Sequence, residues 1–135
     1  MFTMLALLTP GTPDVSIEEL ADKVQALFGG NKNFWSEYEM LPGQKNRNIM
    51  LHWNDWSMRL FCESGETPRA DAAEIARILG ESTPSGVAES TRRIRALFED
   101  DPEERYIDEM VEITSMLKDM EGIVVFDPQQ KDIVS

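Results

Sequence analysis

The segment that decides the fold is Asn48 to Cys62, NIMLHWNDWSMRLFC. Two runs of strand-forming residues flank Asn54-Asp55, which is a plausible two-residue hairpin turn. A hairpin closed at this turn places Trp53 opposite Trp56. The same register pairs Leu51 with Met58 and Ile49 with Leu60 on one face, and His52 with Ser57 and Met50 with Arg59 on the other. This consistent register predicts two antiparallel strands.

Upstream of the hairpin, the sequence predicts a strand, a helix and a further strand. Phe2 to Leu8 is a nearly continuous apolar run that stops at turn residues, as in a strand buried on both faces. Ser16 to Glu19 forms a capping box ahead of apolar residues at helical spacing, and Gly29-Gly30 ends that helix. Phe34 to Leu41 alternates in polarity, which predicts a strand with one wetter face.

Downstream of the hairpin, the patterns predict three helices and a final strand. Thr67-Pro68 is expected to begin one helix, and the apolar spacing between Val87 and Phe98 indicates another. Asp101 to Glu104 is expected to begin the last helix, whose apolar side consists of Tyr106, Ile107, Met110, Val111, Thr114 and Leu117. Ile123 to Phe126 reads as a buried strand, and the tail from Lys131 to Ser135 can add a short return strand.

The predicted element order is therefore β-α-β-β-β-α-α-α-β in a single domain, residues 1–135. Runs of strands followed by runs of helices favour an α+β fold, with a mostly antiparallel sheet and the helices packed on one face. A chain of this length can bury a full hydrophobic core without disulfides or metals.

Charge and composition narrow the classes of partner. The chain has 25 acidic and 13 basic side chains, a net charge of −12, which repels nucleic acids and anionic membranes and attracts basic proteins. Solubility alone is the alternative explanation. The longest apolar run, Met4 to Leu8, is too short to span a bilayer, and a lone Cys62 forms no internal disulfide. We therefore expect a cytoplasmic protein.

The residues available for catalysis are few. His52 is the only histidine, so a metal cluster built on histidines is excluded. The hairpin register places His52 and Cys62 on opposite faces, which argues against a nucleophilic pair. We expect His52 to be an ordinary sheet histidine and Cys62 a buried small hydrophobe. The sequence thus predicts no cofactor, no metal and no enzymatic activity.

The acidic segment from Glu99 to Glu112 is the best candidate for a partner-binding site. It holds eight acids against Arg105 alone. The proposed contact residues are Glu99, Asp100, Asp101, Glu103, Glu104, Asp108 and Glu112. Three of them recur every four residues, at 104, 108 and 112, and would share one helix face. Alternatively, these acids form a solvent-exposed helix face and stabilise the N-terminal end of the helix through its dipole. Binding of a divalent ion is a third interpretation.

Aromatic residues are concentrated in the predicted strands. If Trp53 and Trp56 face the helices, they belong to the core. If the second sheet face is open, Trp35 or Tyr38 can anchor a partner.

The overall organisation resembles the small bacterial immunity-type proteins of polymorphic toxin systems. The resemblance rests on the strand-helix start (Met4 to Leu8, then Ser16 to Phe28), the aromatic meander and the ending Gly122 to Gln130. It implies a cognate toxin held by an acidic surface, without turnover. Two alternatives stay open. One is a homo-oligomeric structural or regulatory subunit, for example a homodimer, and the other is a small enzyme that uses carboxylates for catalysis.

Overall fold

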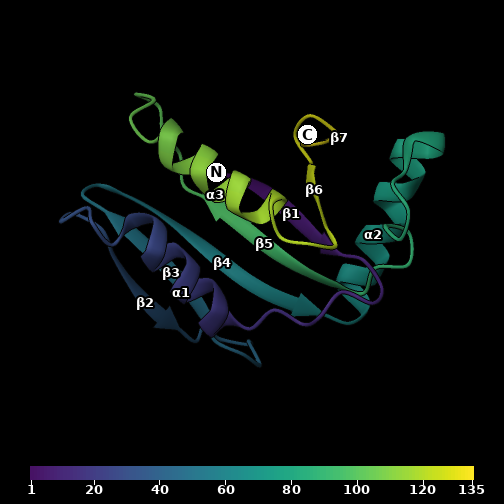
Figure 1. Cartoon of the computed structure of the whole chain (residues 1–135), viewed down its shortest axis with the longest axis horizontal. Coiled ribbons are helices and arrows are strands. Elements are labelled where there is room, and N and C mark those ends of the chain that lie inside the picture. The colour runs from purple at the N-terminus through teal and green to yellow at the C-terminus, as the bar shows by residue number, and fades with distance from the viewer.

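A computed structural model describes all residues from 1 to 135, and it shows one open antiparallel sheet with three α-helices (Figure 1). The sheet has seven strands in the order β2-β3-β4-β5-β1-β6-β7. The elements are β1 (Phe2–Leu8), α1 (Ile17–Phe28), β2 (Trp35–Glu39), β3 (Asn48–Trp53), β4 (Trp56–Ser64), α2 (Glu66–Leu79), a 3-10 turn (Gly80–Ser82), β5 (Arg92–Phe98), α3 (Ile107–Lys118), β6 (Ile123–Asp127) and β7 (Asp132–Ile133). The predicted α+β class is confirmed, and β7 is the return strand expected of the tail.

The hairpin of β3 and β4 has the predicted register throughout, from Ile49 opposite Leu60 to Trp53 opposite Trp56. Its turn is of a different kind from the Asn-Gly turns that usually close such hairpins. Neither Asn54 nor Asp55 has a positive φ, whereas a type I′ turn needs positive φ at both positions. The two-residue turn is therefore not of type I′, and the apolar pairs along the hairpin support the same register.

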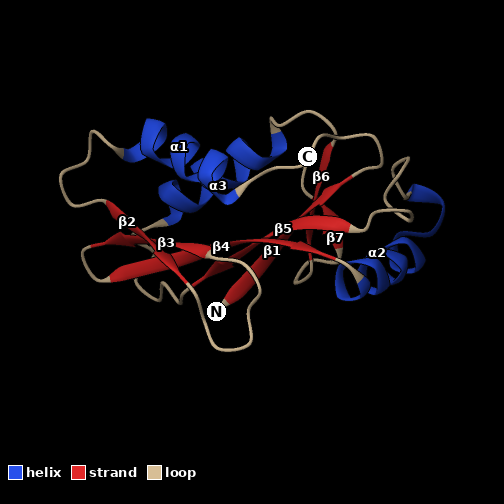
Figure 2. Ribbon diagram, turned by 90° about the horizontal axis from the view of Figure 1, so that it is seen from below, coloured by secondary structure: helices blue, strands red, loops and turns tan.

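The main core lies between one sheet face and two helices, α1 and α3 (Figure 2). The capping box of Ser16 and Glu19 begins α1 as predicted, and the helix buries Leu20, Val24 and Phe28. The Phe28 ring meets the Trp53 ring edge-on, with 5.1 Å between the centroids. Trp53 and Trp56 are both buried in this core, so they are structural residues.

The prediction that all helices share one face was wrong for α2. This helix packs on the opposite face, where Ala72 and Ile75 meet Leu5 and Leu7 of β1. Ala6 and Leu8, the residues that alternate with them, point into the main core. Because the apolar run of β1 is buried on both faces, each face needs a covering helix, and α2 supplies the second one.

The helix predicted between Val87 and Phe98 is wrong as well, because Arg92–Phe98 forms β5 in the middle of the sheet. β5 pairs with β4 on one side and with β1 on the other. Ile94, Ala96 and Phe98 face the main core, at a spacing of two. The observed order is thus β-α-β-β-β-α-β-α-β-β.

The last helix begins later than predicted, at Ile107. Residues 101–106 form a loop, in which Glu104 adopts a left-handed backbone with φ of 55°. The Asp101 carboxylate accepts hydrogen bonds from the backbone N–H groups of Arg105 and Tyr106, at 3.0 and 2.9 Å. Asp101 therefore orders the loop ahead of the helix. None of the helices is long and apolar enough to cross a bilayer.

Candidate functional site

The loop between β5 and α3 carries much of the predicted acidic site, and several contacts fix it against the β3–β4 turn. The Tyr106 hydroxyl donates to the Asp55 carboxylate at 2.5 Å, and Arg105 forms an ion pair with the same carboxylate. The Tyr106 ring stacks on Trp56, with centroids 5.0 Å apart and planes 8° from parallel. Trp56 Nε1 donates to the Glu99 carbonyl at 3.0 Å. The acids of this loop thus project from an ordered backbone.

The structure divides the predicted site residues into engaged and free carboxylates. Asp100 forms an ion pair with the N-terminal amine, Asp101 caps the loop, and Glu103 lies 3.6 Å from Arg105. No ion pair involves the other four: Glu99, Glu104, Asp108 and Glu112. Every arginine of the chain is paired with an acid. No guanidinium is left over to neutralise these four.

The expectation of a single helix face for three of these acids holds for two. Asp108 and Glu112 lie one turn apart in α3, but Glu104 lies in the loop before it. Burial, together with the negative charge of Asp108 and Glu112, raises the pKa of Glu109 above its ordinary value. The carboxylates of α3 therefore repel one another.

A shallow apolar groove runs beside these acids, between α3, β1 and the chain's last residues. Its volume is about 400 Å³. The lining residues are Phe2, Met4, Ile107, Met110, Val111, Thr114, Ser115, Lys118 and Val134. Ile107 and Val111 remain 44% and 57% exposed. The sequence places both on the apolar side of this helix. Their position in the groove depends on how far β1 extends under α3, which no local sequence pattern reveals.

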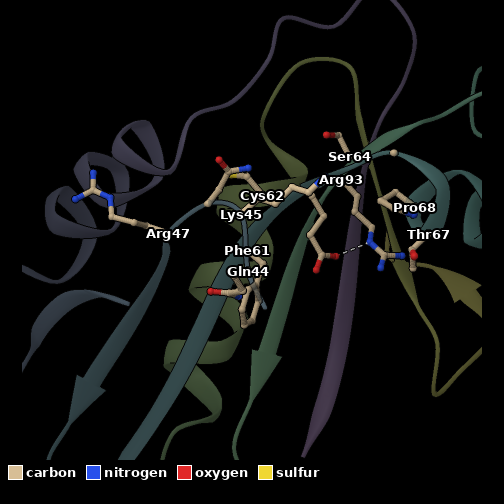
Figure 3. Close-up of a pocket in the computed structure, with 12 residues that line it drawn as sticks. Gln44, Lys45, Arg47, Phe61, Cys62, Ser64, Thr67, Pro68 and Arg93 are labelled. Carbon is tan, nitrogen blue, oxygen red and sulfur yellow. Dashed lines mark hydrogen bonds and ion pairs between the residues drawn. The ribbon is translucent and has the colours of Figure 1, made fainter. Parts of the chain in front are cut away.

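A second, larger hollow is polar and lies at the other end of β5 (Figure 3). Residues Gln44–Arg47, the end of β4 and the start of α2 surround its volume of about 560 Å³. Arg93 pairs with Glu63 at 2.8 Å and with Asp71 at 2.6 Å, and Arg47 pairs with Glu18 at 2.8 Å. The positive charge around this hollow is therefore largely neutralised.

Cys62 lines the same hollow and also packs against the main core. Burial raises the pKa of its thiol to about 11. At neutral pH the group is a neutral thiol, which is a poor nucleophile.

His52 lies on the open sheet face, away from Cys62 as predicted. Its Nε2 is 2.6 Å from the Glu37 carboxylate, and its ring stacks on Trp35 with centroids 3.9 Å apart. Ser57 lies opposite it in the ladder but makes no hydrogen bond to it. No group of three or more histidine, cysteine, aspartate or glutamate side chains is arranged to hold a metal ion.

Aromatic surface is also exposed at the sheet edge, on both faces: Trp35 lies opposite His52 on the open face, and Tyr38 lies opposite Ile49 on the face that α1 covers. Trp35 is 54% exposed and Tyr38 is 42% exposed. The Arg47 guanidinium lies 4.0 Å from the centre of the Tyr38 ring. Trp35 is therefore the less covered of the two candidate anchors.

The sequence matches no protein-family model and no curated protein, and no solved structure matches the fold.

Proposed function

We propose that this protein is a non-catalytic binding module of the immunity or inhibitor type, which neutralises a basic toxin or enzyme through its acidic surface. The surface consists of Glu99, Glu104, Asp108 and Glu112, and we call it the acidic surface. One observation carries the proposal: all arginines are paired within the fold, whereas these four carboxylates have no ion-pair partner.

The mechanism is electrostatic attraction followed by occlusion. A net charge of −12 attracts a basic partner over distances comparable to the Debye length, which speeds association at low salt. Contacts of Asp55, Trp56 and Tyr106 hold the acidic loop in place, so binding orders few additional residues and costs less entropy. A basic partner also relieves the repulsion among the carboxylates of α3, which adds to burial in raising the pKa of Glu109. The bound protein then covers the partner's active site or substrate groove.

The proposal places the protein in the bacterial cytoplasm, where the lone Cys62 stays reduced. It assigns no role to nucleic acids or membrane lipids, because both carry negative charge.

Affinity capture with matched variants tests the proposal. The protein is immobilised and exposed to a lysate of its own cells at about 50 mM and then about 500 mM NaCl, a range over which surface charges become screened. The test variant combines Glu104→Gln, Asp108→Asn and Glu112→Gln. The control combines Glu81→Gln, Glu89→Gln and Glu121→Gln, which removes the same charge from exposed, unpaired acids elsewhere.

We expect one basic protein to be retained in stoichiometric amount at low salt and released at high salt. With that protein purified, the test variant should associate about tenfold more slowly and the control variant nearly as fast as the native protein. Equal rates for the two variants would move the interface away from the acidic surface. Asp101 is kept in both variants because its carboxylate orders the loop.

A homo-oligomeric structural or regulatory subunit is a second candidate, which the exposed Trp35 and Tyr38 at the sheet edge favour. Light scattering of the purified protein separates the two, because this candidate requires a stable dimer without any other partner.

A further inference from the structure

The apolar groove and the acidic surface share α3, and their arrangement specifies a partner in more detail. We infer that the groove binds a basic amphipathic helix of the partner protein, with the partner's apolar side chains on Ile107 and Val111 and its Lys or Arg side chains beside Asp108 and Glu112. This inference rests on the proposed function and names the part of the partner that the site recognises.

The helical repeat sets the two kinds of side chain next to each other. Ile107 and Val111 are four residues apart and so lie one above the other on α3. Asp108 and Glu112 each follow by one residue, which rotates them by about 100° around the helix axis. An acidic row therefore runs along the apolar row, on the solvent side of the groove.

The partner segment is a helix because the groove offers side chains and no free backbone. Its floor includes Phe2 and Met4 of β1. This part of β1 pairs with β5 on one edge, and on the other edge the Gln129 side chain bonds the backbone N–H and carbonyl of Thr3, at 3.0 Å each. A strand could form no ladder there, whereas a helix needs only side-chain contacts. The 12 residues of α3 span about 18 Å, enough to contact roughly three turns of a second helix.

Charge excludes the other occupants of such a groove. A second copy of this chain would bring Asp108 and Glu112 against a surface that is itself acidic, and an anionic lipid surface would be repelled in the same way. The groove also has a polarity. Lys118 lies at its far end, with Asp108 near the opposite one, so the partner's positive charges should be concentrated over the first turns of α3.

The probe for this inference is a synthetic, fluorescein-labelled peptide of about 14 residues, long enough for the three turns that the groove accommodates. It carries leucines at helical i, i+3, i+4 and i+7 positions, with lysines along one flank. Two control peptides keep its length: one has the same residues in scrambled order, and the other has glutamate in place of lysine. Binding to the full-length protein is followed by fluorescence anisotropy.

The test variant is Ile107→Ser with Val111→Ser, and both sites are exposed, so the fold should persist, as circular dichroism can verify. Ile78→Ser is the matched control, since Ile78 is a 38% exposed residue on α2. The double variant should bind the peptide at least about tenfold more weakly, because two apolar contacts are lost. Ile78→Ser should bind like the native protein, and neither control peptide should bind comparably.

NMR spectra of labelled protein locate the contact: the peptide should shift the methyl signals of Ile107 and Val111. Equal binding of the scrambled peptide, unchanged affinity of the double variant, or shifts centred on Trp35 would each overturn the inference. These results leave the proposed function standing if the captured partner still depends on the acidic surface. Conversely, if the peptide binds the groove but no basic protein is captured at low salt, the inference about the groove stands and the proposed function is rejected.

Discussion

Asp101 belongs to the acidic segment in sequence, but its carboxylate serves the fold. Each of its two oxygens accepts a hydrogen bond from a backbone N–H group in the loop just before α3. We expect Asp101→Ala to lower the free energy of unfolding by about 1 kcal/mol, because two backbone N–H groups of the loop lose their acceptor. Urea unfolding followed by circular dichroism measures it. Glu103→Ala, an exposed neighbour with only a long ion pair, should change stability by less than about 0.5 kcal/mol. Equal effects would mean that the Asp101 hydrogen bonds contribute nothing.

The Cys62 thiol should react slowly in the folded protein. Its pKa is raised from 9.0 to about 11, mainly by burial. At pH 8 this difference reduces the thiolate fraction about 100-fold relative to the unfolded chain, and the thiolate is the reactive form. A colorimetric disulfide reagent, with and without denaturant, compares the two rates. A native rate within a few-fold of the denatured one would show that the thiol is not buried as described.

At the residue scale, sequence patterns gave the face of a side chain more readily than its exposure. The hairpin register correctly separated His52 from Cys62, because alternation along a strand is geometric. Helical spacing placed Ile107 and Val111 on the apolar side of α3 but could not show that β1 leaves them partly open. Likewise, a string of acids does not reveal that Asp101 is engaged with backbone amides while Asp108 is free.

Among the elements, β5 shows where local pattern fails. Val87, Thr91, Ile94 and Phe98 fit a helical spacing, while Ile94, Ala96 and Phe98 equally fit the period of a strand. In the structure this segment is a strand because it pairs with both β4 and β1 and lies between them in the sheet. These pairings are between segments far apart in the sequence, so no local pattern contains them. The long hairpin was predictable because both its halves carry matching pairs, and α1 because its capping box marks the start.

The β3–β4 turn should control the order of the acidic loop. Asp55 receives hydrogen bonds from Tyr106 and Arg105, which hold its pKa below the ordinary value. Its contribution is therefore present above the unfolded-state pKa and is lost as pH falls through the folded-state pKa. At pH 7 we expect Asp55→Ala to speed amide hydrogen exchange in residues 101–106 several-fold while leaving the β3–β4 ladder protected. Asn54→Ala is the matched control. Unchanged exchange in the loop would mean that other contacts, such as the Tyr106 stack on Trp56, suffice.

For the molecule as a whole, the two ends of β5 differ in charge. Arg92 and Arg93 lie at its start, where their partners Asp14, Glu63 and Asp71 neutralise them. The loop after its end begins the acidic surface. Under the proposed function, this separation would orient the protein toward its basic partner before contact.

The sheet edge at β2 decides whether the protein also binds itself. An antiparallel pairing of two β2 strands about a twofold axis at the strand's middle residue would set Glu37 opposite Glu37, and like charges directly opposite are destabilising. We therefore expect light scattering to give the monomer mass, 15.4 kDa, at pH 7 and low salt, over roughly a hundredfold range of concentration. Glu37→Thr removes the repulsion and suits a strand, so it should increase self-association, while Glu81→Gln, the control, should not. A native protein at twice the monomer mass would contradict this expectation and make the homo-oligomeric subunit the leading explanation of the exposed Trp35.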